Sequence, residues 1–99
     1  MSTITDIQTG IFFYTNSEKR GEGVQYDPSA IGRTIRRLRL RAGMSQDALS
    51  GLAGIARTHL SMIENGEKQP NFETIWKIAA ALEMRASDLI VEIEHDCSD

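Results

Sequence analysis

Residues 45–65 constrain the fold most strongly, because they are patterned as two short helices joined by a tight turn. Ser45 can cap the first helix, since a serine hydroxyl accepts a hydrogen bond from a first-turn N–H that has no partner within the helix. Leu49 and Leu52 then follow at helical spacing, which predicts one apolar face. Gly54 can adopt the left-handed conformation that ends a helix. The stretch therefore predicts a helix, a turn and a second helix.

The second predicted helix has an inward apolar face and an outward polar face. Leu60 and Ile63 repeat the inward spacing, and Ile55 is the apolar anchor between the two helices. An arginine and a hydroxyl in the first turn of an exposed helix suit the recognition of base edges in a DNA groove. The residues left facing outward are Arg57, Thr58, Ser61 and Met62.

The segments around this pair of helices form one extended pattern over residues 31–89, about 60% of the chain. In order and spacing it resembles the helix-turn-helix domain of the lambda-repressor/Cro type, also called the XRE family. The segments that carry the resemblance are IGRTIRRLR, GMSQ, LAGI, HLSMIENG and PNFETIWKIAAAL.

The resemblance implies an all-α, five-helix DNA-binding domain at residues 27–94. It also implies a homodimer that places two recognition helices, each at about 57–64, in successive major grooves. The operator should then be near-palindromic double-stranded DNA, with half-sites about 34 Å apart. Residues 1–26 would be an N-terminal extension, and residues 95–99 a disordered tail.

Within this framework we expect two classes of DNA contact. Base contacts are predicted for the outward residues of the second helix, with Arg57 bidentate to a guanine and Met62 against a thymine methyl group. Gln46 starts the first helix, whose N-terminus favours anions. The predicted contacts to the DNA backbone are Ser45, Gln46, His59, Asn65, Arg37 and Arg41.

The resemblance also implies an ion pair between Arg39 and Glu64, which would clamp the first helix of the domain to the recognition helix. Two residues depart from the family pattern in ways that lower the expected stability. Gly51 lies inside a helix and costs about 1 kcal/mol relative to alanine. Ala56 occupies a cap position where serine or threonine is common, and this also costs about 1 kcal/mol.

The N-terminal extension contains two runs with strand propensity, IFFYT at 11–15 and VQY at 24–26. They are separated by a polar, glycine-bearing segment, so the extension could form a β-hairpin. Asp27 and Pro28 then predict the start of a helix, with aspartate as the cap and proline in the first turn.

The C-terminal part predicts two further helices. Asn71 caps one of them, and Trp76 is out of phase with its inward stripe, so Trp76 lies either under the N-terminal extension or in a subunit interface. Ser87 caps a last helix, from Asp88 to about Glu94, that carries more apolar surface than one small core can bury. The excess predicts a dimer interface made of Leu89, Ile90, Ile93 and Trp76.

Charge is distributed unevenly along the chain, whose formal net charge is −3. Residues 29–62 contain six arginines and a single acid, Asp47, a local charge of +5, so the other residues together carry −8. A basic face on an acidic body orients a molecule toward phosphates. At 99 residues and 40% apolar content, the chain is expected to form one domain with a modest core.

Several other classes of function find no support in the sequence. Cys97 is the single cysteine, and His59 and His95 lack partners at ligand spacing, so neither a disulfide nor a metal site is expected. We find no catalytic constellation and no motif for a cofactor, so we expect neither an enzyme nor a cofactor-binding protein. No apolar run is long enough to span a membrane and no secretory signal is evident, which predicts a cytoplasmic protein.

Three functions are compatible with the resemblance. The first is a dimeric transcription regulator, typically a repressor. The second is an antitoxin, whose residues 1–26 would neutralise a toxin protein. The third is a restriction-modification controller. An oligomerisation module with no affinity for DNA is an alternative from a different class.

Overall fold

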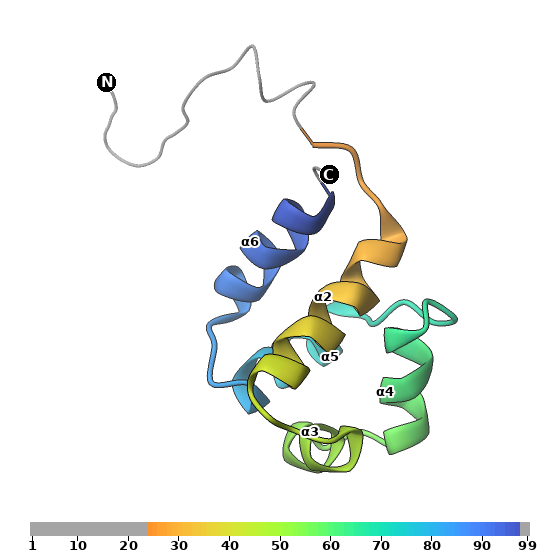
Figure 1. Ribbon diagram of the computed structural model, residues 1–99, viewed down its shortest axis with the longest axis vertical. Helices are drawn as coiled ribbons and strands as arrows, with labels where there is room; N and C mark the ends of the chain where they lie inside the picture. The colour runs from red at the N-terminus through yellow and green to blue at the C-terminus, as the bar shows by residue number, and fades with distance from the viewer. Residues whose placement is uncertain (1–23, 98–99) are drawn as a thin grey trace.

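The computed structural model describes residues 24–97 as five α-helices, and these described residues contain no strand. Figure 1 shows α3 and α4 together at one end of the molecule, with α6 running beside α2 toward the other end. The all-α fold class predicted from the sequence is therefore confirmed. The helices are α2 (Pro28–Arg41), α3 (Gln46–Ala53), α4 (Arg57–Glu64), α5 (Phe72–Ala81) and α6 (Ala86–Cys97).

Side-chain caps start three of these helices, at the residues that the sequence predicted. Each cap satisfies a first-turn N–H that has no acceptor within its helix. By contrast, Ala56 precedes α4 without any side-chain cap bond. The cap bonds run from Ser29 N to Asp27 Oδ1 (3.0 Å), from Ala48 N to Ser45 Oγ (3.0 Å) and from Thr74 N to Asn71 Oδ1 (2.8 Å).

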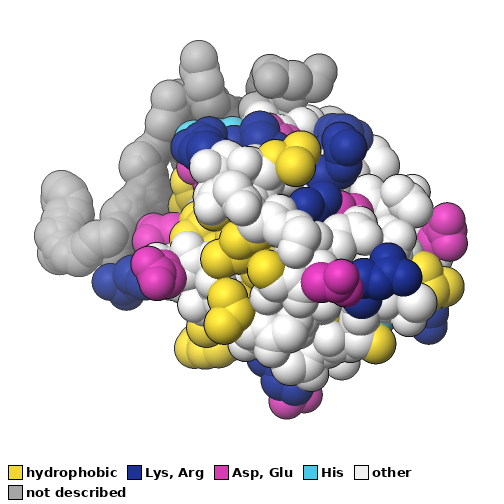
Figure 2. All heavy atoms as spheres, turned by 60° about the horizontal axis from the view of Figure 1, so that its bottom comes forward, with side chains coloured by type: hydrophobic (Ala, Val, Ile, Leu, Met, Phe, Trp, Pro, Cys, Tyr) yellow, Lys and Arg dark blue, Asp and Glu magenta, His cyan; other side chains and the backbone are white. Residues whose placement is uncertain are grey.

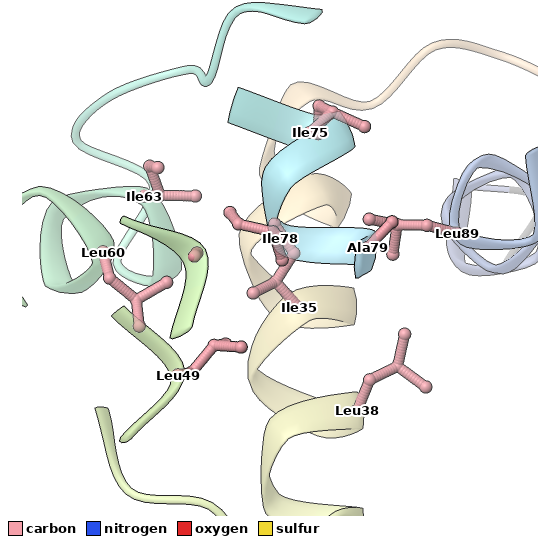
Figure 3. Close-up of a cluster of buried hydrophobic side chains, with 10 residues drawn as sticks. Ile35, Leu38, Leu49, Leu60, Ile63, Ile75, Ile78, Ala79 and Leu89 are labelled. Atoms are coloured by element: carbon pink, nitrogen blue, oxygen red, sulfur yellow. The ribbon is translucent and has the colours of Figure 1, made fainter. Parts of the chain in front are cut away.

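All five helices contribute to one hydrophobic core, and Figure 3 shows its side chains gathered between them. Burial of these aliphatic side chains supplies the main favourable free energy of folding. Because every helix contributes to the same core, α3 and α4 are held in fixed orientation. The fully buried large apolar side chains are Ile35, Leu49, Leu60, Ile63, Ile78 and Leu89.

Leu89 and Leu52 lie elsewhere than the sequence predicted. Leu89 was expected in a dimer interface, but it is 0% exposed, because α6 turns it into the core. Leu52 was expected on the inward face of α3, but it is 66% exposed. The buried face of α3 is formed by Leu49, Ser50 and Ala53, and Leu52 lies about 100° from the centre of that face.

The last helix is longer than the sequence predicted. We expected it to run from Asp88, behind a Ser87 cap, to about Glu94, with a disordered tail from His95. Instead α6 runs from Ala86 to Cys97, so Ser87 lies inside the helix. The extra turn is held to α2, because the Asp96 carboxylate accepts hydrogen bonds from the Thr34 hydroxyl and from Arg37 Nη2 (3.1 Å). Residues 98–99 lie outside the described part of the chain.

The predicted β-hairpin falls mostly on residues 1–23, which lie outside the described part of the chain. Its second strand was expected at residues 24–26. These residues are described, and they lead into α2 without forming a strand. The role proposed for residues 1–26 as a separate extension therefore stays a prediction.

Helices α2 and α4 are in close backbone contact at Gly32. A Cβ atom built on Gly32 would overlap the carbonyl oxygen of Ile63 and would lie 2.9 Å from the carbonyl oxygen of Glu64. Both obstacles are backbone atoms, which cannot move without shifting α4. The absence of a side chain at Gly32 is therefore what allows this packing.

We predict that Gly32→Ala destabilises the domain by about 2 kcal/mol or more, because overpacking must displace α4 from α2. Gly51→Ala is the matched control, since a Cβ there meets nothing within 4 Å. It should stabilise the domain by about 0.5–1 kcal/mol through helix propensity. Chemical denaturation of both variants tests this, and equal stability changes would contradict the close-packing argument.

Candidate nucleic-acid interface

Helices α3 and α4 form the helix-turn-helix unit, with Gly54 between them in the left-handed conformation (φ 72°). Arg57 and Thr58, the first two residues of α4, are exposed. Ser61 and Met62 follow one turn later and are half-buried. Figure 2 views the molecule with this end turned forward, and basic side chains gather along the upper edge of that view.

The opposite end of α4 is fixed by a buried ion pair between Arg39 and Glu64, as the sequence predicted. Arg39 Nε lies 2.7 Å from Glu64 Oε2, and Nη2 lies 2.9 Å from Oε1. The third contact of the guanidinium is with the carbonyl oxygen of Met44, 2.9 Å from Nη1. The two side chains are 8% and 1% exposed. The hydrogen bonds with Glu64 raise the pKa of Arg39 above its ordinary value.

Glu64 also connects the recognition helix to the start of α3. Gln46 Nε2 donates a hydrogen bond to Glu64 Oε1 over 3.0 Å, at the same oxygen that accepts from Arg39 Nη2. Three helices, α2, α3 and α4, are therefore connected through one carboxylate. Gln46 is only half-buried, so its side chain stands at the surface beside the N-terminus of α3.

The exposed residues predicted to meet DNA are arranged around this framework. Arg57 Nε lies 3.4 Å from Asp47 Oδ1, so an ion pair joins the first turns of α3 and α4. Ser45 and Asn65 are exposed at the start of α3 and the end of α4, whereas His59 is half-buried. Arg41 is exposed at the end of α2.

Arg37 differs from its predicted role as a contact to the DNA backbone. Arg37 Nη2 lies 2.9 Å from Glu92 Oε1 and 3.1 Å from Asp96 Oδ2, both on α6. The bond with Glu92 is the main reason why the pKa of Arg37 is raised. Arg37 therefore joins α2 to α6 rather than offering a free guanidinium to phosphate. Its acidic partners lie more than 50 residues away, so helical spacing alone did not indicate them.

Arg36 is a candidate that the sequence reasoning missed. It is exposed and takes part in none of the ion pairs found among residues 24–97. The available signal was its spacing, four residues after Gly32 and three before Arg39, which places it on the side of α2 that faces α4. It lies in a groove between α2 and the end of α4, lined by Arg33, Arg36, Arg37, Leu40, Glu64 and Asn65.

A second surface, formed by α5 and the start of α6, is apolar. Phe72 and Trp76 are 63% and 59% exposed, and their rings meet edge to face with centroids 6.0 Å apart. Ile90 is 37% exposed and lines the same groove. Ile93, which was predicted to join this surface, is half-buried and packs against the core instead. We call the set Phe72, Trp76 and Ile90 the aromatic surface.

Comparison with known proteins decides the family. The family model described as Helix-turn-helix matches residues 35–89, which is more than half of the chain. The chain belongs to this helix-turn-helix family. The matched residues run from α2 to α6 and include both the Arg39–Glu64 pair and the first turn of α4. The resemblance to the XRE type that the sequence motifs indicated is thereby confirmed.

Two named proteins are similar to the chain over about 60 residues. It is 33% identical over 60 residues to the HTH-type transcriptional regulator SutR of Escherichia coli K12, covering 61% of this chain and 34% of that protein. It is 35% identical over 61 residues to control protein C.BamHI of Bacillus amyloliquefaciens, covering 61% and 75%. The chain thus spans about a third of SutR and three quarters of C.BamHI.

A solved structure shows the same fold. The restriction-modification controller protein C.AhdI of Aeromonas hydrophila superposes with a TM-score of 0.61 at 32% sequence identity. The match covers 64% of this chain and 96% of that one.

Residues 24–97 contain no cluster of side chains that could hold a metal ion. Within the same residues, every helix is too short or too polar to cross a membrane.

The contacts of Asp96 predict how the domain responds to acid. The hydrogen bond from the Thr34 hydroxyl and the charge of Arg37 lower the pKa of Asp96 below 3.8. A lowered folded-state pKa contributes stability above the unfolded value, and this contribution is lost as the pH falls through the folded pKa.

We therefore expect Asp96→Asn to lower the free energy of unfolding at pH 7 by about 1 kcal/mol, since its bonds are partly exposed. The difference from the parent chain should shrink as the pH drops below 3.8. Glu94→Gln on the same helix is the control and should match the parent at every pH. Urea unfolding across pH 2–7 measures this, and a difference independent of pH would contradict it.

Proposed function

We propose that this chain is a sequence-specific, DNA-binding transcriptional regulator that acts as a homodimer. The observation that carries the proposal is the geometry of α4. Its first turn presents Arg57 and Thr58 to solvent, while its last residue is fixed to α2 by the buried Arg39–Glu64 pair. A rigid, exposed helix end with an arginine and a hydroxyl is suited to the major groove.

Base recognition would begin at the first turn of α4. Arg57 can donate two parallel hydrogen bonds to O6 and N7 of a guanine, a pairing that distinguishes this base from the other three. Thr58 can contact either a base or a phosphate. Ser61 and Met62 are half-buried and lie one turn further along α4, where Met62 can contact a thymine methyl group.

Backbone contacts would surround this end of α4 and fix its register on the duplex. Ser45 and Gln46 lie at the N-terminus of α3, whose unpaired N–H groups and helix dipole favour a phosphate. We assign Arg36 to the role that the sequence gave to Arg37, because Arg36 shares a groove with Asn65 and has no acidic partner among the described residues. His59 and Arg41 remain proposed backbone contacts.

The aromatic surface is the proposed dimer interface. Exposed phenyl and indole rings beside an isoleucine are unfavourable in water, and aromatic residues are enriched at the buried centres of protein interfaces. Dimerisation through this surface would place two recognition helices on a near-palindromic operator. Of the residues predicted from the sequence, Trp76 and Ile90 belong to this surface.

The similarity to C.BamHI and C.AhdI favours one specific alternative, a restriction-modification controller. Such a controller would use the same fold and the same contacts with DNA, and would differ in the operon that it regulates. The relatives described above include no antitoxin, so we do not extend the proposal to a toxin partner. The proposed role requires no catalysis. It would be carried out in the cytoplasm of a cell whose DNA lies in that compartment.

Selection of bound duplexes from a random pool tests the proposed function. The parent chain should enrich a near-palindromic sequence, because a symmetric dimer reads two equivalent half-sites. Arg57→Ala should weaken binding to that sequence by about 1–3 kcal/mol and relax the preference at one base position per half-site. An unchanged preference in Arg57→Ala would remove Arg57 from the set of base contacts.

Binding to the selected duplex distinguishes the proposed role of Arg36 from that of Arg37. Arg36→Ala should weaken binding to all sequences alike and reduce the salt slope of log K by about one for each phosphate that is no longer neutralised, with little change in stability. Arg37→Ala should instead lower stability, because it removes the cation that pairs with both Glu92 and Asp96, and the salt slope should stay unchanged. The opposite pattern would return the phosphate contact to Arg37.

Sedimentation of charge variants tests the dimer interface. Trp76→Glu should shift the chain toward monomer, because it places a carboxylate in the centre of an apolar contact. Leu52→Glu is the control, since Leu52 is similarly exposed but lies on α3. It should leave the dimer intact. Equal dissociation constants for Trp76→Glu and the parent would exclude the aromatic surface as the interface.

A further inference from the structure

We propose that Asp47 determines the sequence specificity of the chain by orienting the Arg57 guanidinium for base recognition. Asp47 would act as a positioning residue, because its carboxylate contacts Arg57 and the base contact is made by Arg57. The inference rests on the proposed function and deepens it. Asp47 is an acidic residue in the arginine-rich segment 29–62, whose positive charge attracts phosphates.

The atom that Asp47 contacts gives the geometric basis. Its Oδ1 lies 3.4 Å from Nε of Arg57, the inner nitrogen of the guanidinium. The two outer nitrogens are left available as a planar pair of donors. Such a pair matches O6 and N7 of guanine, so a carboxylate near Nε can restrain the group without occupying these donors.

The position of Asp47 in the fold supports this role. It lies in the first turn of α3, next to Gln46, and reaches across to the first turn of α4. Among residues 29–62 it is the single acid against six arginines. A carboxylate at a surface that approaches phosphates lowers affinity for every sequence, since it opposes the electrostatic attraction of the arginines. Asp47 therefore does not add to the general attraction for DNA, and the side-chain contact that the structure gives it is with Arg57.

The strength of the pair depends on its surroundings. In the free chain Asp47 and Arg57 are 83% and 52% exposed, and an ion pair in water contributes little to stability. A DNA duplex docked on α4 would exclude water from the pair and strengthen the attraction between the two charges. The pair would thus restrict the Arg57 side chain most where the base is read.

Two simpler roles for Asp47 make different predictions. As an acid in the first turn of α3, it can stabilise that helix through the helix dipole. Its loss would then lower stability and leave sequence preference unchanged. As a charge that merely repels phosphate, its loss would raise affinity for all duplexes by the same factor. Neither role requires Arg57.

The experiment compares the duplex selected by the parent chain with an unrelated duplex of equal length. Four full-length chains are used: the parent, Asp47→Asn, Arg57→Ala and the double variant. We expect Asp47→Asn to bind the unrelated duplex more tightly, while the ratio of the two affinities falls roughly five- to tenfold. In the Arg57→Ala background, adding Asp47→Asn should change this ratio less than about twofold, because the interaction between the two side chains is already absent.

Asp47→Glu keeps the charge and should recover part of the ratio, which a purely structural role would not predict. Thermal unfolding of each variant provides the check on folding. The inference is overturned if the ratio stays unchanged in Asp47→Asn, or if it falls equally with and without Arg57. A parent chain that enriches no sequence at all would contradict the proposed function itself.

Discussion

The structure depends on the buried pair of Arg39 and Glu64. Two charges removed from water attract each other strongly, but desolvation offsets most of that gain, so such a pair contributes more to geometry than to net stability. Here the geometry is specific, because the guanidinium forms two hydrogen bonds with one carboxylate and a third with the Met44 carbonyl. The carboxylate also accepts a bond from Gln46. One acid therefore sets the relative position of the first helix and both helices of the helix-turn-helix unit.

Close packing and charge act on the same short segment. The Gly32 backbone lies against the carbonyl groups of Ile63 and Glu64, and the Arg39 side chain bonds the Glu64 carboxylate. Steric contact fixes how near α2 and α4 lie, and the ion pair fixes their rotation. The last residue of α4 is anchored by these contacts, and Leu60 in its first turn is buried in the core, whereas Arg57 and Thr58 are exposed. Arg57 and its neighbours can consequently face solvent without loss of order in the domain.

The sequence predicted those features that depend on local chemistry or on an extended motif. The caps at Asp27, Ser45 and Asn71 follow from short-range hydrogen bonding, and the pair of Arg39 and Glu64 followed from the family pattern. Features that depend on long-range packing were harder to predict. Leu89 and Leu52 exchanged their expected environments, because spacing alone does not show which side of a short helix meets the core. Arg37 was misassigned for the same reason, since its partners on α6 become neighbours only in the folded chain.

The contacts of α2 have a consequence for the proposed dimer on DNA. On one side α2 is bonded to the recognition helix, and on the other side Arg37 and Thr34 bond it to α6. Ile90, at the edge of the aromatic surface, lies on this same α6. In a dimer joined through that surface, the distance between the two recognition helices would be set by these rigid contacts within each subunit. The rigidity of these α2 contacts would then limit which distances between half-sites a dimer can bind. This limit can be measured as the range of half-site spacings that the dimer accepts.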